Sequence, residues 1–234
     1  MFADFIEPIY FLWNSSISYS YVLNSFAGYA AHFMIATGRT TGGDRTKPRQ
    51  GEILRRSQDK VQSCDDFPVD FPKGILEATG VLLHDKYPTI CGGWDGSNYV
   101  NDCQILTNQI WQHLVSMTER RSSSASIGIN SSSMWVTGGA GDNGWIRSTE
   151  IIKISEDGRL ENAEMGPSLP EGSLGHCLVA LTETTTMALG GNFDKRTHIY
   201  DWASSQWSKG PELNTGDRYF PGCGHLKDTS TGKE

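Results

Sequence analysis

The sequence has no excess of basic residues and no membrane-spanning run. Its 20 lysines and arginines stand against 27 aspartates and glutamates, a formal net charge of −7, without a long run of either sign. Nucleic acids and anionic membranes select basic faces, so we expect neither as the main partner. Residues 5–33 are rich in aromatics, but Asn14, Ser15, Ser16 and Asn24 make the stretch too polar to cross a membrane.

The opening stretch also lacks the positive region of a secretory signal, because the first basic residue is Arg39. Asn14-Ser15-Ser16 and Asn130-Ser131-Ser132 match glycosylation sequons, which matter only in a secreted chain and often arise by chance. The sequence therefore leaves the compartment unknown, either cytoplasmic or extracellular.

Catalytic and metal-binding motifs are missing as well. The chain contains no GxSxG, HExxH, P-loop or dinucleotide fingerprint, and no two of its six histidines lie at helical ligand spacing. Asp65, Asp66 and Asp70 lack the regular oxygen spacing of a calcium loop, which favours a solvated acidic loop. We expect no enzyme activity, no cofactor and no metal site.

The five cysteines form no CxxC pair and fit no zinc module. Cys91 ends one expected strand and Cys103 begins the next, so on one antiparallel hairpin the two can lie within disulfide reach. Two separate, buried free cysteines are an equally good interpretation. The odd total leaves at least one thiol without a partner in the chain.

What the sequence does contain is a glycine doublet that returns three times after a short β-prone run. It stands at Gly92-Gly93, Gly138-Gly139 and Gly190-Gly191, and a weaker copy ends at Gly38. The first glycines are 54, 46 and 52 residues apart (38 to 92, 92 to 138, 138 to 190). A period of about 50 residues that ends a strand in a glycine pair is typical of a β-propeller blade.

Each doublet belongs to a unit of four short, alternating strands. The expected strands are residues 80–83, 87–91, 102–106 and 110–114; 124–129, 133–137, 149–154 and 159–164; and 176–181, 186–189, 197–202 and 206–208. A less regular unit precedes them over residues 17–64, and a fifth opens at 218–226. Since no segment has a 3.6-residue apolar period, we predict an all-β fold.

These residues resemble the kelch repeat, in which a strand ending in Gly-Gly is followed by an aliphatic or tyrosine-containing strand, a spaced tryptophan and a turn marked by arginine or proline. One unit has Trp111 and Arg120-Arg121 after its doublet, and another has Tyr200, Trp207 and Pro211. The unit of Gly138-Gly139 has no matching tryptophan. The resemblance covers residues 33–226 and implies a propeller of the kelch-type, galactose-oxidase-like superfold.

The resemblance also assigns structural roles. We interpret Trp111 and Trp207 as core residues between blades, and the doublets as sites where a missing Cβ permits positive φ and close approach. Residues 1–31 are expected to form an irregular segment or an atypical blade, 32–226 the blades, and 227–234 a polar tail. Only about four blades are present, so we expect an incomplete or open propeller that self-associates through uncovered edges.

The favoured function is a protein-interaction module that binds another protein through loops on one face. Aromatic and arginine side chains in these loops are the types that interface hot spots favour. The expected contact residues are Trp94, Asp95, Asn98, Tyr99, Arg120, Arg121, Asp142, Asn143, Trp145, Arg147, Phe193, Asp194, Lys195, Arg196 and Arg218. Taken singly, each is equally well explained as a solvated loop residue.

Two alternatives stay open. One is an extracellular propeller, stapled by Cys91–Cys103 and glycosylated at Asn130, with carbohydrate-binding or oxidase-like ancestry. Some relatives of the superfold are oxidases with a copper-bound tyrosyl radical, but no set of tyrosines and histidines marks such a centre here. The other is a partial gene product without independent function.

Overall fold

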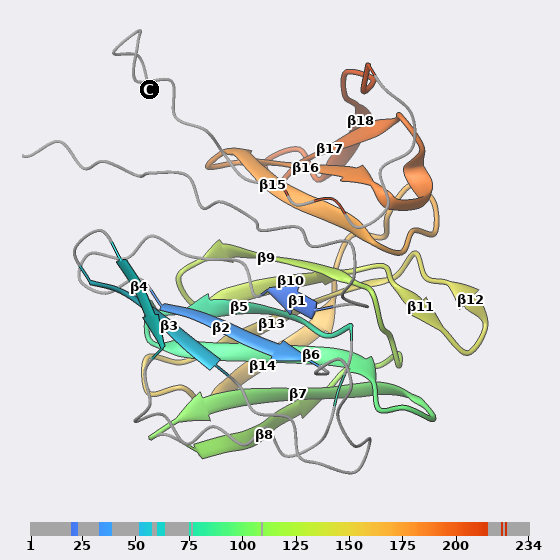
Figure 1. The fold of residues 1–234 in the computed structure, drawn as a ribbon. Helices are drawn as coiled ribbons and strands as arrows, with labels where there is room; N and C mark the ends of the chain where they lie inside the picture. The colour runs from blue at the N-terminus through green and yellow to red at the C-terminus, as the bar shows by residue number, and fades with distance from the viewer. Residues whose placement is uncertain are drawn as a thin grey trace, which may run out of the picture.

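The chain is arranged as successive antiparallel meanders of four strands (Figure 1). The computed structural model describes residues 75, 77–108, 110–214, 221 and 223 in full, and the strand positions and pairing of 20–22, 33–38, 52–57 and 60–63. Within these residues the one helical element is η1 (Gly191–Phe193), a single 3₁₀ turn. The predicted all-β fold is therefore confirmed for the described chain.

Four sheets follow one another along the sequence. The first sheet contains β1 (Ser20–Val22), β2 (Phe33–Gly38), β3 (Glu52–Ser57) and β4 (Lys60–Ser63), and the second contains β5 (Thr79–Leu83), β6 (Tyr87–Trp94), β7 (Tyr99–Thr107) and β8 (Ile110–Ser116). The third sheet contains β9 (Ala125–Asn130), β10 (Ser133–Thr137), β13 (Thr149–Ile154) and β14 (Leu160–Met165). The fourth sheet contains β15 (His176–Thr182), β16 (Thr185–Gly190), β17 (Thr197–Asp201) and β18 (Gln206–Lys209). A small hairpin, β11 (Ala140–Gly141) and β12 (Gly144–Trp145), follows β10.

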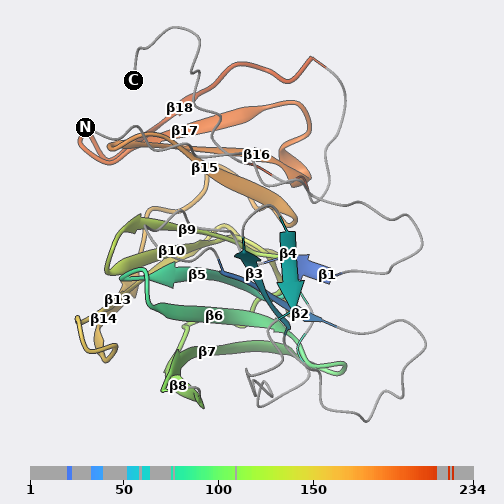
Figure 2. The same ribbon diagram turned by 60° about the vertical axis from the view of Figure 1, so that its left-hand side comes forward.

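In the second, third and fourth sheets the first strands are adjacent. β5 packs beside β9, and β9 beside β15, so the second, third and fourth sheets lie face to face in chain order. Figure 2 shows the fourth sheet, in orange, stacked above the third and second. Alternating side chains of each sheet are buried against the next, because successive residues of a strand point to opposite faces.

The expected strand positions differ from the observed ones mainly at a single hairpin. β6 continues through its doublet to Trp94, and β7 begins at Tyr99 instead of residue 102. A bulge after Cys91 absorbs the doublet, after which Gly93 pairs with Val100 and Trp94 with Tyr99. The hairpin therefore projects further than the alternation pattern predicted.

Two cores hold these three sheets together. Between the second and third sheets the buried side chains are largely aliphatic and sulfur-containing: Val81, Leu83, Tyr87, Cys91, Cys103, Ile105, Met117, Met134, Val136, Ile152 and Ile154. Between the third and fourth they are largely aromatic, with Trp135 in contact with Tyr200, Trp202 and Trp207 at ring-centroid distances of 4.9–5.9 Å.

The doublet of the third sheet shows why glycine is needed at these positions. Gly138 and Gly139 have φ of +57° and +102°, and both are buried. A Cβ on Gly138 would lie 2.5 Å from the carbonyl oxygen of Ser173, and one on Gly139 would lie 2.5 Å from that of Ser122. The doublet is thus wedged between two connecting segments, which we call the first linker (residues 117–124) and the second linker (residues 166–175).

Candidate functional site

The connections between sheets repeat with the same spacing as the doublets. Glu77, Ser123 and Gly175 each stand 15 residues before the first glycine of a doublet, and all three have positive φ, at 60°, 52° and 62°. The amide of Ser123 donates to the carbonyl of Glu77 at 2.9 Å, and the amide of Gly175 donates to that of Ser123 at 2.8 Å. These bonds tie successive connections together at one end of the sheets.

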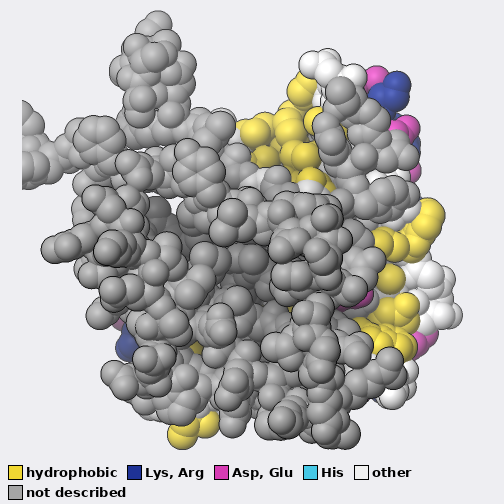
Figure 3. Space-filling view, viewed as in Figure 1, with side chains coloured by type: hydrophobic (Ala, Val, Ile, Leu, Met, Phe, Trp, Pro, Cys, Tyr) yellow, Lys and Arg dark blue, Asp and Glu magenta, His cyan; other side chains and the backbone are white. Residues whose placement is uncertain are grey.

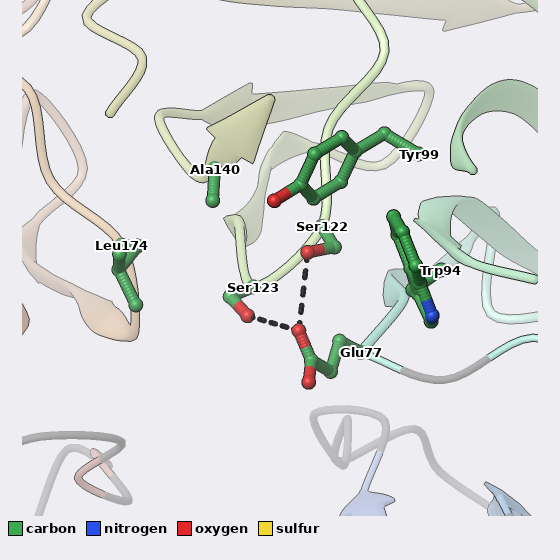
Figure 4. A pocket seen from close by; sticks show the side chains of 7 residues that line it. All are labelled: Glu77, Trp94, Tyr99, Ser122, Ser123, Ala140 and Leu174. Atoms are coloured by element: carbon green, nitrogen blue, oxygen red, sulfur yellow. Dashed lines mark hydrogen bonds between the residues drawn. The ribbon is translucent and has the colours of Figure 1, made fainter. Parts of the chain in front are cut away.

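A pocket of about 360 Å³ opens at this end (Figure 4). It is lined by Glu77, Trp94, Tyr99, Ser122, Ser123, Ala140 and Leu174. The lining residues come from the connection before the second sheet, the ends of β6 and β7, both linkers and the β11–β12 hairpin, so the site depends on the packing of the second and third sheets with their linkers.

The pocket has a polar wall and an aromatic wall. On the polar wall, one carboxylate oxygen of Glu77 accepts hydrogen bonds from the hydroxyls of Ser122 and Ser123 at 3.1 and 2.6 Å. On the other, the rings of Trp94 and Tyr99 meet edge to face with centroids 4.9 Å apart. Figure 4 shows the Tyr99 hydroxyl pointing from the aromatic wall toward the serines. The pocket therefore offers a carboxylate, hydroxyls and ring faces together.

Exposed loops surround this pocket. Asp95 closes the β6–β7 turn by accepting hydrogen bonds from the amides of Ser97 and Asn98 at 2.9 and 2.8 Å. In the β11–β12 hairpin Trp145 is 61% exposed. Hydrophobic side chains also reach the surface along the right-hand edge of the view in Figure 3. Asp142 and Asn143 at the tip of the same hairpin are also exposed.

The second linker holds two of these loops in place. A Cβ on Gly172 would lie 2.7 Å from the carbonyl oxygen of Trp145, so the hairpin packs directly on the linker. From the fourth sheet, Arg196 forms an ion pair with Glu171 of the linker at 3.0 Å, and the Lys195 carbonyl accepts from the amide of Leu213. We call the surface made by residues 94–99, the β11–β12 hairpin and residues 194–196 the pocket face.

The structure corrects the expected role of Arg121, which is fully buried. Its guanidinium donates to the carbonyls of Gly138 and Ser148 at 2.9 Å and pairs with Glu150 at 3.0 Å. Glu150 in turn accepts from the amide of Thr118 at 2.8 Å. Burial lowers the pKa of Arg121, and Glu150 opposes that shift. Arg121 therefore anchors the first linker to the third sheet and is not available to a partner.

Phe193 is a second correction. It is fully buried in η1, where its ring packs against His176 and His198 at centroid distances of 5.4 and 4.8 Å. Nε2 of His176 lies 2.8 Å from the hydroxyl of Thr137, and burial lowers the pKa of this histidine to about 3. Phe193 and His176 belong to the core between the third and fourth sheets. Neither contributes a side chain to the pocket face.

The other predicted contact residues fall into two groups. Trp94 and Tyr99 are half-buried at the pocket. The exposed group consists of the loop residues Asp95, Asn98, Arg120, Asp142, Asn143, Trp145, Arg147, Asp194, Lys195 and Arg196. Arg218 lies outside the described residues. Of the two tryptophans interpreted as core, Trp111 is buried, whereas Trp207 is half-buried and donates to the carbonyl of Ser168 in the second linker at 2.9 Å.

The cysteine pair considered from the sequence lies at directly opposed positions of β6 and β7. The register pairs Cys91 with Cys103, and the two are joined as a disulfide with Cα atoms 4.0 Å apart. A second disulfide, Cys177–Cys223, links β15 to a residue 46 positions later.

Two features are absent from the described residues. No group of three or more His, Cys, Asp or Glu side chains in this part of the chain is placed to hold a metal ion. None of its helical segments has the length and apolar character of a membrane span.

Sequence reasoning missed Glu77, Ser122, Ser123, Ala140 and Leu174. The doublet spacing could have located the connections: 77, 123 and 175 are separated by the same 46 and 52 residues as Gly92, Gly138 and Gly190. It could not have shown that these side chains meet residues of the second and third sheets in one pocket.

Comparison with known proteins identifies the fold alone. No protein-family profile matches the chain, and no curated protein matches it. The solved structure of YjhT is similar with a TM-score of 0.62, at 11% sequence identity, over 83% of this chain and 71% of that one. The similarity and the four-stranded sheets together indicate a propeller-like all-β architecture.

Proposed function

We propose that the chain is a kelch-type β-propeller, with each four-stranded sheet as one blade, and that its pocket face binds another protein. One observation carries the proposal: loops of three consecutive sheets are fastened to two shared linkers, and the loops of the second and third sheets meet at the pocket. Binding residues are commonly placed on loops that a rigid scaffold positions.

The composition of this surface fits a protein partner. Trp145 is an exposed aromatic, Trp94 and Tyr99 form a half-buried aromatic pair, and Arg196 is exposed. Tryptophan, tyrosine and arginine are the side chains most enriched at the energetic centres of protein interfaces. An exposed tryptophan on a hairpin also costs little conformational entropy when a partner covers it.

The pocket itself would take a side chain of that partner. Its aromatic wall can pack against an apolar or cationic group, and the Glu77 carboxylate opposite can accept hydrogen bonds from a donor. The hydroxyls of Ser122 and Ser123 hold that carboxylate in position, so a partner group would meet a preformed acceptor.

Site-specific photocrosslinking in cells tests this assignment. A photoreactive amino acid replaces one of three exposed asparagines: Asn98 or Asn143 on the pocket face, or Asn162 on β14 as the control. We expect one partner to be crosslinked from both pocket-face positions and not from β14.

The purified partner then allows a quantitative test. Trp145→Ala is expected to weaken binding roughly tenfold or more, and Glu77→Gln to weaken it as well. Leu160→Ala, which removes an exposed apolar side chain from β14, should leave the dissociation constant unchanged. Equal crosslinking from all three asparagines, or wild-type affinity in Trp145→Ala, would contradict the proposal.

A further inference from the structure

All four cysteines among the described residues form disulfides. Cys91–Cys103 lies within the core between the second and third sheets, with both residues 0% exposed. Cys177–Cys223 connects the fourth sheet to a residue beyond its last strand. Disulfides form and persist in oxidising compartments and are rare in the cytosol, where thiols are kept reduced.

A second, independent feature lies at the turn between β9 and β10. Asn130 and Ser131 are exposed there, and they open the sequon Asn130-Ser131-Ser132. Oδ1 of Asn130 accepts hydrogen bonds from the amide and the hydroxyl of Ser132 at 2.9 and 3.0 Å. The first and third residues of the sequon are therefore already in contact.

The surroundings of this turn suit a bulky modification. No described residue accepts a hydrogen bond from Nδ2 of Asn130, the nitrogen to which a glycan would be attached. The carbonyl of Ser131 accepts from the amide of His84 at 2.6 Å, which holds the turn against the second sheet. β10 runs from this turn to the Gly138-Gly139 doublet, so the turn and the pocket face are at opposite ends of the sheet.

We infer that this chain matures in an oxidising secretory compartment and carries an N-linked glycan on Asn130. In the modification, Nδ2 of Asn130 forms a bond to C1 of an oligosaccharide carried on a diphospholipid. The C1–O bond to the diphosphate breaks, Nδ2 gives up one proton, and the lipid diphosphate leaves. Each disulfide forms when two thiols pass two electrons and two protons to a disulfide-bearing oxidant, which is released as a dithiol.

The test uses the full chain isolated from cells that produce it naturally. Digestion with a peptide-N-glycosidase in ¹⁸O water should convert Asn130 to ¹⁸O-labelled aspartate, which mass spectrometry detects, and should increase the mobility of the protein on a gel. Produced in the same cells, Asn130→Gln and Ser132→Ala should each lose the modification at this site. Ser131→Ala is the matched control and should keep it, because the middle position of a sequon accepts any residue except proline.

Thiol labelling of the unfolded, unreduced protein tests the compartment separately. Iodoacetamide should leave Cys91, Cys103, Cys177 and Cys223 unlabelled and react with them only after reduction. Labelling of these four before reduction would overturn the compartment assignment. An unmodified Asn130 in a disulfide-bonded protein would overturn the glycan assignment, and thermal melts of the three variants show whether a lost signal reflects misfolding.

Discussion

The two interfaces between neighbouring sheets perform the same structural task with different side chains. Between the second and third sheets, aliphatic residues surround the Cys91–Cys103 disulfide. Between the third and fourth, Trp135 is fully buried among Tyr200, Trp202 and Trp207. The third sheet therefore presents Met134 and Val136 to one neighbour and Trp135 to the other, on alternate residues of a single strand.

What the two interfaces share is their backbone geometry. At each, a glycine of the doublet approaches a linker carbonyl: Gly92 would bring a Cβ to 2.5 Å from Arg121, and Gly138 to 2.5 Å from Ser173. The amides of Gly93 and Gly139 donate to the same two carbonyls at 2.7 Å. The repeat thus constrains the backbone contacts between sheets, and the side chains that fill the interface can vary as long as the volume is packed.

The largest expected effect comes from the aromatic interface. We expect Trp135→Ala to lower the free energy of unfolding by about 3–5 kcal/mol, because it leaves a cavity where three rings converge. Trp145→Ala, which truncates an exposed tryptophan, should change it by less than about 0.5 kcal/mol. Urea unfolding monitored by circular dichroism measures both. Similar losses in the two variants would show that the aromatic cluster does not hold the sheets together.

The aliphatic interface can be weakened at its disulfide. We expect the double variant Cys91→Ala, Cys103→Ala to be destabilised by about 3 kcal/mol, because the unfolded chain gains the conformations that the cross-link had excluded. The same denaturant titration measures the loss. Wild-type protein unfolded in the presence of dithiothreitol should lose at least as much stability, because the reductant opens Cys177–Cys223 as well as Cys91–Cys103. A wild-type midpoint that does not respond to the reductant during unfolding would argue against the cross-link.

The shared backbone geometry is tested by two glycines with the same φ of +102°. Gly139 lies against the carbonyl of Ser122, whereas a Cβ on Gly144 would meet no atom within 4 Å. Both alanine variants place a Cβ at the same unfavourable φ, so their difference reports mainly the contact with the linker. We expect Gly139→Ala to cost about 2 kcal/mol more than Gly144→Ala in thermal or urea unfolding. Equal costs would mean that the linker can shift freely.

The smallest expected effect is a pH dependence from the aromatic interface. Burial lowers the pKa of His176 to about 3, whereas in the unfolded chain it is near 6.5. Below pH 6.5 the unfolded state therefore binds a proton that the folded state does not, and stability falls as the pH falls toward 3. Between pH 7 and 5.5 the loss should be about 1 kcal/mol.

His176→Gln should reduce this pH dependence. Burial also lowers the pKa of His198, which contributes in the same direction in the wild type and in the variant. An unchanged pH profile in His176→Gln would show that His176 is protonated in the folded protein.

Much of the fold could be predicted from the sequence because its determinants are local. The strand β13 was expected at its observed bounds, residues 149–154, from alternation alone. Placing Cys91 and Cys103 on one hairpin made their opposition one of two interpretations, and the strand register pairs them. Arg121 was misassigned because a surface arginine and a buried one look alike in sequence, and its partner Glu150 stands 29 residues later.

The sequence by itself determined the all-β class, the period of the sheets and the turns at which exposed loops occur, because alternation and glycine conformations act within a few residues. Only the tertiary structure decided which connections meet. Glu77, Ser122 and Tyr99 become one pocket because the first linker is hydrogen-bonded to both the second and the third sheet, and the packing of those sheets depends on contacts between distant residues. That same packing placed Phe193 and Arg121 in the interior. The residues next to them in the sequence do not predict this burial.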